Sequence, residues 1–128
     1  MSTAKEEVRR IPKPPRGLME ALDAASLAGI VTEVRRGLES VYGDRLAALL
    51  LFGSYARGDA EPGSDVDLLV VLRGEVEPAR EISRTSDVLA DVSLEHDVVV
   101  SCAYVSEERF RTERSPFLLN VRREGRGA

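Results

Sequence analysis

The spacing of apolar residues changes sharply near residue 45. Between residues 18 and 41 the apolar positions recur at three- and four-residue steps, the period of one face of a helix. Gly43-Asp44 ends this pattern. Two short, nearly continuous apolar runs follow, Leu46–Phe52 and Val66–Leu72. Both are too short for a helix, so each predicts a buried strand.

The second half of the chain continues the alternation of helical and strand patterns. It predicts a helix over 78–93, a β-branched strand over 97–105, and short helices over 106–113 and 116–123, with Ser106 as an N-cap. The predicted order is α-β-turn-β-α-β-α. This order indicates a small α/β domain with a three- to four-stranded mixed sheet flanked by helices.

Composition and charge fit one folded domain with basic ends. The chain has 128 residues, 43% apolar and 31% charged. A proline-rich stretch separates residues 1–16, which hold five Lys/Arg and two Glu, from a domain predicted over 17–128. We expect 1–16 to be mobile. Residues 109–128 hold six Arg and two Glu, which leaves 7 basic and 18 acidic residues between the ends. Duplex nucleic acid, which favours a continuous basic face, is therefore a poor partner.

The sequence points to the cytoplasm. No apolar run approaches the roughly 20 residues that cross a bilayer. The N-terminus is charged and rich in proline, without the apolar stretch of a secretory signal. The single cysteine, Cys102, lies in an apolar stretch and is expected in the core.

The connection between the first two strands carries phosphate-binding residues. It runs from Gly53 to Asp65 and is long for a hairpin in a small domain. Gly53 lets a ligand approach the backbone, and Ser54 offers an N–H and a hydroxyl where the chain turns from strand to helix. Arg57 could add a bidentate contact to the same anion. Gly-Ser alone is also an ordinary helix start, so these residues need support from the rest of the loop.

Asp65 and Asp67 supply that support. Residues i and i+2 of a strand point to one face, and two ionised carboxylates there repel each other and resist desolvation. A divalent cation removes both penalties, and Mg²⁺ prefers such oxygen ligands next to phosphate. The competing interpretation is an exposed strand end after a turn. The phosphate-type turn at the other end of the same loop favours the metal site.

Together these residues form a motif that resembles a known family signature. Gly53-Ser54, ten residues, then Asp65-x-Asp67, with Arg57-Gly58 between, resembles the signature of the polymerase-beta-like nucleotidyltransferase superfamily. More narrowly, it resembles the minimal nucleotidyltransferases (MNT), which are usually encoded beside a HEPN-domain partner. The resemblance runs from about residue 18 to 125 and includes the tail SPFLLNVRREG. This sequence stops at Arg-Gly-Ala, where relatives often continue into a short final strand. The sheet is therefore expected to lack its last edge strand or to borrow one.

The resemblance implies a third carboxylate on the strand after the acid pair. The candidates are Asp97, Glu95 and Asp91, and Asp97 is favoured because the predicted strand opens there. His96, the only histidine, is expected to be a structural or surface residue rather than a ligand.

The resemblance also implies a reaction. Asp65, Asp67 and Asp97 would hold two Mg²⁺ ions and carry the catalysis, while Gly53, Ser54 and Arg57 would hold an NTP, with ATP favoured. The expected transfer is of AMP to a hydroxyl, above all a tyrosine of a HEPN toxin, which would make the chain an antitoxin. Two alternatives stay open: a small-molecule transferase of the aminoglycoside type, and a non-catalytic antitoxin that binds its HEPN partner by occlusion. The nucleotide base, the acceptor and the oligomeric state, including a homo-oligomer, stay open as well.

Overall fold

The computed structural model describes residues 20–128, so the segment 1–16 that we expected to be mobile lies outside the described residues. The elements, in chain order, are α3 (Ala24–Tyr42), a 3₁₀ turn η1 (Gly43–Arg45), β1 (Leu46–Phe52), α4 (Gly53–Arg57), β2 (Val66–Leu72), α5 (Pro78–His96), β3 (Val100–Ser106), α6 (Glu107–Thr112), α7 (Pro116–Glu124) and β4 (Arg126–Gly127). The bounds predicted for the first two strands are confirmed.

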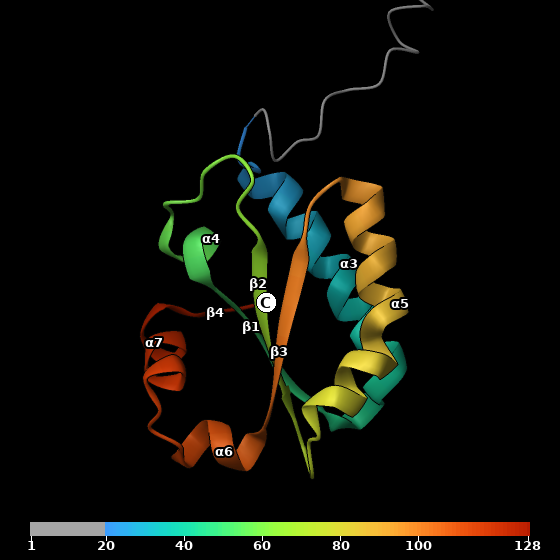
Figure 1. The fold of residues 1–128 in the computed structure, drawn as a ribbon, viewed down its shortest axis with the longest axis vertical. Helices are drawn as coiled ribbons and strands as arrows, with labels where there is room; N and C mark the ends of the chain where they lie inside the picture. Colours follow the sequence, from blue (N-terminus) through green and yellow to red (C-terminus); the bar gives the residue numbers. More distant parts are fainter. Residues whose placement is uncertain (1–19) are drawn as a thin grey trace, which may run out of the picture.

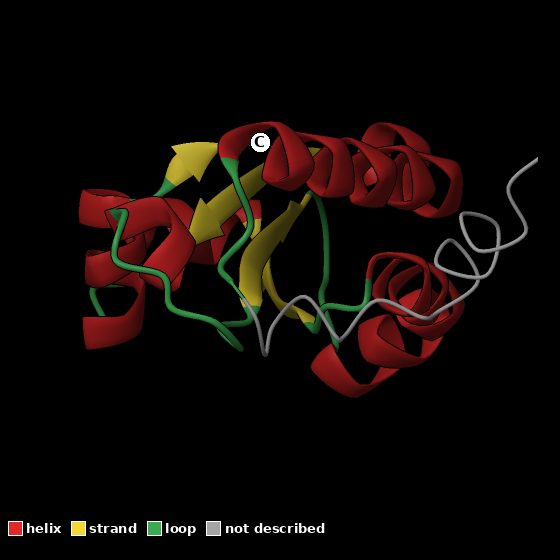
Figure 2. Cartoon of the chain, turned by 90° about the horizontal axis from the view of Figure 1, so that it is seen from above, coloured by secondary structure: helices red, strands yellow, loops and turns green. Residues whose placement is uncertain are grey.

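The four strands form one mixed sheet in the order β3-β2-β1-β4. β1 is antiparallel to β2 and to β4, whereas β2 and β3 are parallel and are joined through α5. The helices cover both faces of the sheet, with α3 and α5 on one side and α4, α6 and α7 on the other (Figure 1). The view from above shows the sheet between these two layers (Figure 2). The predicted α/β class and mixed sheet are confirmed.

β2 is central because its side chains are apolar on both faces. Val66, Leu68, Val70 and Leu72 belong to the core beneath α3 and α5. Leu69 and Val71 belong to a second core, which includes Leu118 and Val121 of α7. Every residue of β2 is buried except Asp67, which is half-buried. The continuous apolar run is thus explained by burial on both faces, and Asp67 stands out as the exception.

The start predicted for the third strand is wrong. α5 continues to His96 and β3 begins only at Val100, so Asp97 is not a strand residue. Asp97 follows the helix in the left-handed conformation, φ 53°, and its N–H donates to the carbonyl of Ser93. Aspartate tolerates this conformation better than most residues. The β-branched run at 98–100 concealed the extra helical turn and the connection that follows it.

The expectation of a missing sheet edge is also wrong. Arg126 and Gly127 form β4, which pairs with Leu51 and Leu50 of β1. The carbonyl oxygen of Ala128 accepts hydrogen bonds from the guanidinium of Arg35 on α3. The last residues of the chain therefore supply their own edge strand.

Two smaller expectations are met. Ser106 caps α6 by accepting a hydrogen bond from the N–H of Arg109, as predicted. Cys102 packs against the core beneath α3 and α5, where burial raises the pKa of its thiol to about 12. Among residues 20–128, no helix has the length and apolar character needed to cross a bilayer.

Candidate functional site

Antiparallel pairing of β1 and β2 brings the two ends of the long loop together. Phe52 is the Cα partner of Asp67, so α4, which begins at Gly53, starts directly beside that aspartate. Gly53 has φ 75°, and a Cβ placed on it would lie 2.3 Å from Oδ2 of Asp67. Any other residue would be strained there and would displace the carboxylate. Gly53 is therefore required by its close contact with Asp67.

Asp65 and Asp67 form a carboxylate pair with no cationic partner within hydrogen-bonding distance among the described residues. Asp65 is exposed and Asp67 is half-buried. Within residues 20–128, neither carboxylate makes a hydrogen bond or an ion pair. Burial, followed by the charge of Asp65, raises the pKa of Asp67, while the charge of Arg57 opposes this rise. Both causes are penalties on the ionised form.

This donor set fits a divalent cation. Two carboxylates one residue apart, whose oxygens accept no hydrogen bond from residues 20–128, offer the hard ligands that Mg²⁺ takes. A bound cation would reduce both the repulsion and the desolvation cost that raise the pKa of Asp67. Asp65 and Asp67 could therefore hold a metal ion.

Arg57 lies at the end of α4, one turn after the Gly-Ser pair. Its Nε is 3.2 Å from Oδ2 of Asp59, and its Nη1 is 3.2 Å from Oε2 of Glu124. These two carboxylates raise the pKa of Arg57. Ser54 is half-buried, and its carbonyl accepts hydrogen bonds from the N–H groups of Gly58 and Asp59 as α4 ends. The loop therefore turns back toward β2 immediately after Arg57.

The third predicted carboxylate is not gathered with the other two. Asp97 lies at the same end of the sheet, because the N–H of Val66 donates to the carbonyl of Val99, two residues after Asp97. The ligand oxygens of Asp65, Asp67 and Asp97 do not all come within 4.8 Å of one another. The position on β3 that pairs with Asp67 is occupied by Ser101. The role of Asp97 therefore stays a prediction.

The other candidates near Asp97 have different surroundings. His96 Nε2 lies 2.7 Å from Oε2 of Glu33 and links α5 to α3. Glu95, Glu33 and His96 together bring one ligand atom each within 4.8 Å. Asp91 is an exposed residue of α5. A contact between the two long helices accounts for His96, in keeping with the structural role expected of it.

Sequence reasoning missed the residues that reach α4 from the C-terminal end of the chain. Glu124 of α7 pairs with Arg57, and the guanidinium of Arg126 donates to the carbonyl of Ala56. No spacing rule links positions so far apart. Two other C-terminal arginines also contact the chain, since Arg122 donates to the carbonyl of Phe110 and Arg123 to the side chain of Asn120.

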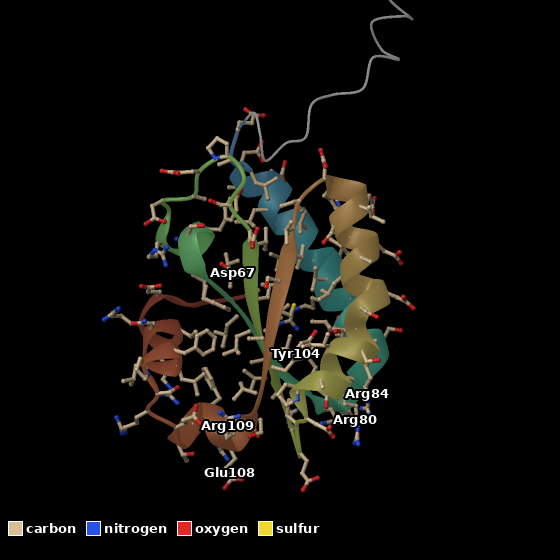
Figure 3. All side chains as sticks on the ribbon, viewed as in Figure 1. Asp67, Arg80, Arg84, Tyr104, Glu108 and Arg109 are labelled. Atoms are coloured by element: carbon tan, nitrogen blue, oxygen red, sulfur yellow. The ribbon has the colours of Figure 1, made fainter. Side chains whose placement is uncertain are left out.

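A hollow of about 970 Å³ lies at the opposite end of the sheet, away from the acid pair. Figure 3 shows Arg80, Arg84, Glu108 and Arg109 there, with Asp67 beside α4 at the other end. The walls of the hollow carry arginine and glutamate in equal number. The closest pairs are Arg80–Glu77 at 3.1 Å and Arg84–Glu81 at 3.7 Å. Because these charges neutralise one another within the wall, the hollow does not resemble the unpaired carboxylates of the candidate site.

Comparisons with known proteins identify the family of this chain. The family described as "Nucleotidyltransferase domain" matches residues 31–123, a range that contains the Gly-Ser turn and all three aspartates. A relative from Methanocaldococcus jannaschii, "Putative protein adenylyltransferase MJ0604", is 36% identical over 97 residues, which cover 75% of this chain and 91% of the relative.

Solved structures share the fold at low sequence identity. A toxin-antitoxin crystal structure with AMP-PNP aligns with a TM-score of 0.56 and 18% identity, over 75% of this chain and 69% of that one. A structure of the tri-AMPylated Shewanella oneidensis HEPN toxin in complex with MNT antitoxin aligns with a TM-score of 0.50 and 16% identity, over 80% and 68% of the two chains. At these identities the likeness establishes the fold.

Proposed function

The chain belongs to the nucleotidyltransferase domain family, and from that premise we propose that it transfers AMP from ATP to a tyrosine hydroxyl of a HEPN-domain protein, and so acts as an antitoxin. The observation that carries the proposal is the placement of Gly53, the start of the phosphate-type turn, against the carboxylate of Asp67. This contact joins the two halves of the motif into one site.

Different residues of this site would bind the metal and the nucleotide. Asp65 and Asp67 would hold Mg²⁺, which when bound neutralises phosphate charge and makes an acceptor hydroxyl more acidic. The turn at Gly53-Ser54 and the guanidinium of Arg57 would bind the triphosphate oxygens and stabilise the charge that develops on departing pyrophosphate. Asp97 keeps the role of third carboxylate in this proposal, from the same end of the sheet.

The exposure of the acid pair favours an acceptor carried by another protein. Asp65 is exposed and Asp67 is half-buried, so a side chain presented from outside can reach them. Small-molecule sites usually bury most of their ligand in a cleft. The hollow in the described part of the chain lies at the other end of the sheet instead. A tyrosine on a flexible segment of a partner suits the open site better than an enclosed drug does.

The comparisons support a protein acceptor and a HEPN partner. The relative from Methanocaldococcus jannaschii is named as a protein adenylyltransferase, and one structural neighbour is a complex of an AMPylated HEPN toxin with MNT antitoxin. A second neighbour was solved with AMP-PNP, an ATP analogue. We therefore take ATP as the nucleotide and a HEPN-domain protein as the partner.

Transfer of label tests the proposal. We expect a HEPN-domain reading frame beside this gene, and its product, incubated with this chain, Mg²⁺ and ATP labelled in the α-phosphate, should gain labelled AMP on tyrosine. Asp67→Asn should lower the transfer rate about a hundredfold or more, because the metal loses a ligand. Asp87→Asn, which removes an exposed aspartate of α5, is the matched control and should transfer label at the wild-type rate.

Each other result selects a different function. Equal protection of cells by wild type and Asp67→Asn, with no label transferred by either, would show inhibition by occlusion. Label transferred to an aminoglycoside but not to the HEPN protein would show a small-molecule transferase. Asp97→Asn belongs in the same assay, where a folded variant with wild-type transfer would remove Asp97 from the site.

A further inference from the structure

The short helix α4 is held from the far end of the chain. It has only five residues, so its position depends on contacts with other elements. We call residues 124–128 the closing segment. Figure 1 shows α4 beside α7 and β4, which carry this segment. Within it, Arg126 donates to the carbonyl of Ala56, and the pairing of β4 with β1 fixes the backbone next to α4.

The side chain of Arg57 lies between two carboxylates of unequal exposure. Asp59, on the loop after α4, contacts Nε, and its side chain is 62% exposed. Glu124, at the last position of α7, contacts Nη1, and its side chain is 23% exposed. The Nη2 group has no hydrogen-bond partner among residues 20–128. Arg57 is thus tethered at two nitrogens with a third still available to a ligand.

We propose that Glu124 is a positioning residue of the nucleotide site: it holds the guanidinium of Arg57 beside the Gly53–Asp67 contact, ready for the phosphates of ATP. This inference rests on the proposed function. An arginine side chain has many rotamers in water, and a ligand that must select one of them loses affinity. The anchored carboxylate of Glu124 removes part of that cost before the nucleotide arrives.

A simple charge argument makes the opposite prediction. If Glu124 acted only as a negative charge near the triphosphate, or as a competitor for Arg57, its removal would tighten nucleotide binding. If Glu124 orders Arg57, its removal weakens binding, and only while Arg57 is present. The sign of the effect and its dependence on Arg57 therefore separate the two roles.

Calorimetry with Mg²⁺ and AMP-PNP measures that sign. Glu124→Gln should weaken binding about two- to fivefold, the typical worth of one partly exposed ion pair. Arg57→Ala should weaken it more. In the Arg57→Ala background, a further Glu124→Gln substitution should change the affinity by less than the uncertainty of the measurement, because no guanidinium is left to position. In turnover assays, Glu124→Gln should raise KM for ATP and leave kcat near the wild-type value.

Two matched variants separate positioning from generic effects. Glu61→Gln removes an exposed carboxylate from the loop after α4 without touching Arg57, so it should leave AMP-PNP affinity unchanged or slightly tighter. Glu113→Gln breaks a comparable pair, Arg109–Glu113 at 2.7 Å, on another part of the surface. Its melting temperature should fall about as much as that of Glu124→Gln, while its affinity for AMP-PNP stays at the wild-type value.

The outcomes also separate this inference from the proposed function. Wild type that binds no AMP-PNP with Mg²⁺ contradicts the nucleotide site and the positioning role together. Wild-type binding with equal or tighter binding by Glu124→Gln overturns the positioning role alone. Weakening by Glu124→Gln that persists in the Arg57→Ala background also overturns it, because the effect would then not pass through Arg57.

Discussion

Each end of the sheet has a carboxylate that folding buries at least in part. The two carboxylates differ in the hydrogen bonds that the chain donates to them. Glu81, at the hollow end, is 2% exposed and accepts hydrogen bonds from the Tyr42 hydroxyl at 3.0 Å and the Glu77 N–H at 3.3 Å. Nη1 of Arg84 lies 3.7 Å from Oε1 of Glu81. Asp67, at the α4 end, has no such donors among residues 20–128 and lies next to a second carboxylate, Asp65.

This difference separates an acid with a structural role from the acid that we propose binds a metal ion. Burial and the hydrogen bond to Glu81 raise the pKa of Tyr42, so the hydroxyl remains a donor at neutral pH. Next to it, Thr85 bonds to Tyr104, and within residues 20–128 no buried side-chain polar atom lacks a partner. Glu81 is therefore satisfied by its own chain. Asp67 receives no such hydrogen bonds from residues 20–128, so we expect Glu81, the fully partnered acid, to matter more for stability.

Glu81→Ala should give the largest change in stability. Removal of the buried carboxylate leaves the Tyr42 hydroxyl and the Glu77 N–H without their acceptor, which should cost about 3 kcal/mol in free energy of unfolding. Glu81→Gln keeps an oxygen acceptor at the same length and should cost less. Glu77→Ala, which removes a 63%-exposed side chain, should cost under about 1 kcal/mol. Urea denaturation measures all three, and equal costs for Glu81→Ala and Glu77→Ala would contradict the comparison.

What the sequence could predict follows from how local each signal is. The limits of β1 and β2 were predicted correctly because an apolar run bounded by polar residues specifies a buried strand without help from distant residues. The acid pair and Gly-Ser turn are likewise local, and antiparallel pairing of neighbouring strands brings them together. The parts of the site closest to the proposed chemistry were thus the easiest to predict.

The parts that could not be predicted depend on long-range contacts or on one unusual residue. The start of β3 was placed too early because Asp97 takes a left-handed conformation that no spacing rule reveals. β4 has two residues and forms only by pairing with β1, so it carries no pattern of its own. The pairing of Arg57 with Glu124 depends on that same closure. Knowledge of the three-dimensional fold was needed for each of them.

Ligand-dependent stability should give an effect of intermediate size. Mg²⁺ with AMP-PNP at a hundredfold excess over Kd should add about 2.7 kcal/mol to the free energy of unfolding, provided that only the folded state binds. Asp65→Asn combined with Asp67→Asn should abolish this gain. Glu81→Gln, altered at the other end of the sheet, should retain it. Thermal melting with and without ligand gives the comparison, and equal shifts in wild type and the double variant would exclude the metal site.

The smallest effect, and the most direct test of the strain at the α4 end, is the stability of Asp67→Asn without metal. The pKa of Asp67 is raised in the folded protein, so ionisation of this carboxyl opposes folding. The stability that the protonated carboxyl contributes is present below the unfolded-state pKa and is lost as pH rises through the folded-state pKa. In metal-free buffer, Asp67→Asn should therefore be more stable than wild type at pH 7, by less than about 1 kcal/mol because the side chain is partly solvated. The difference should shrink toward pH 3, where both proteins carry a neutral group. Asp87→Asn, at an exposed position of α5, should follow the wild-type curve at every pH. If Asp67→Asn proved less stable than wild type at pH 7, its carboxylate would have a stabilising partner in the folded chain, and the contrast with Glu81 would disappear.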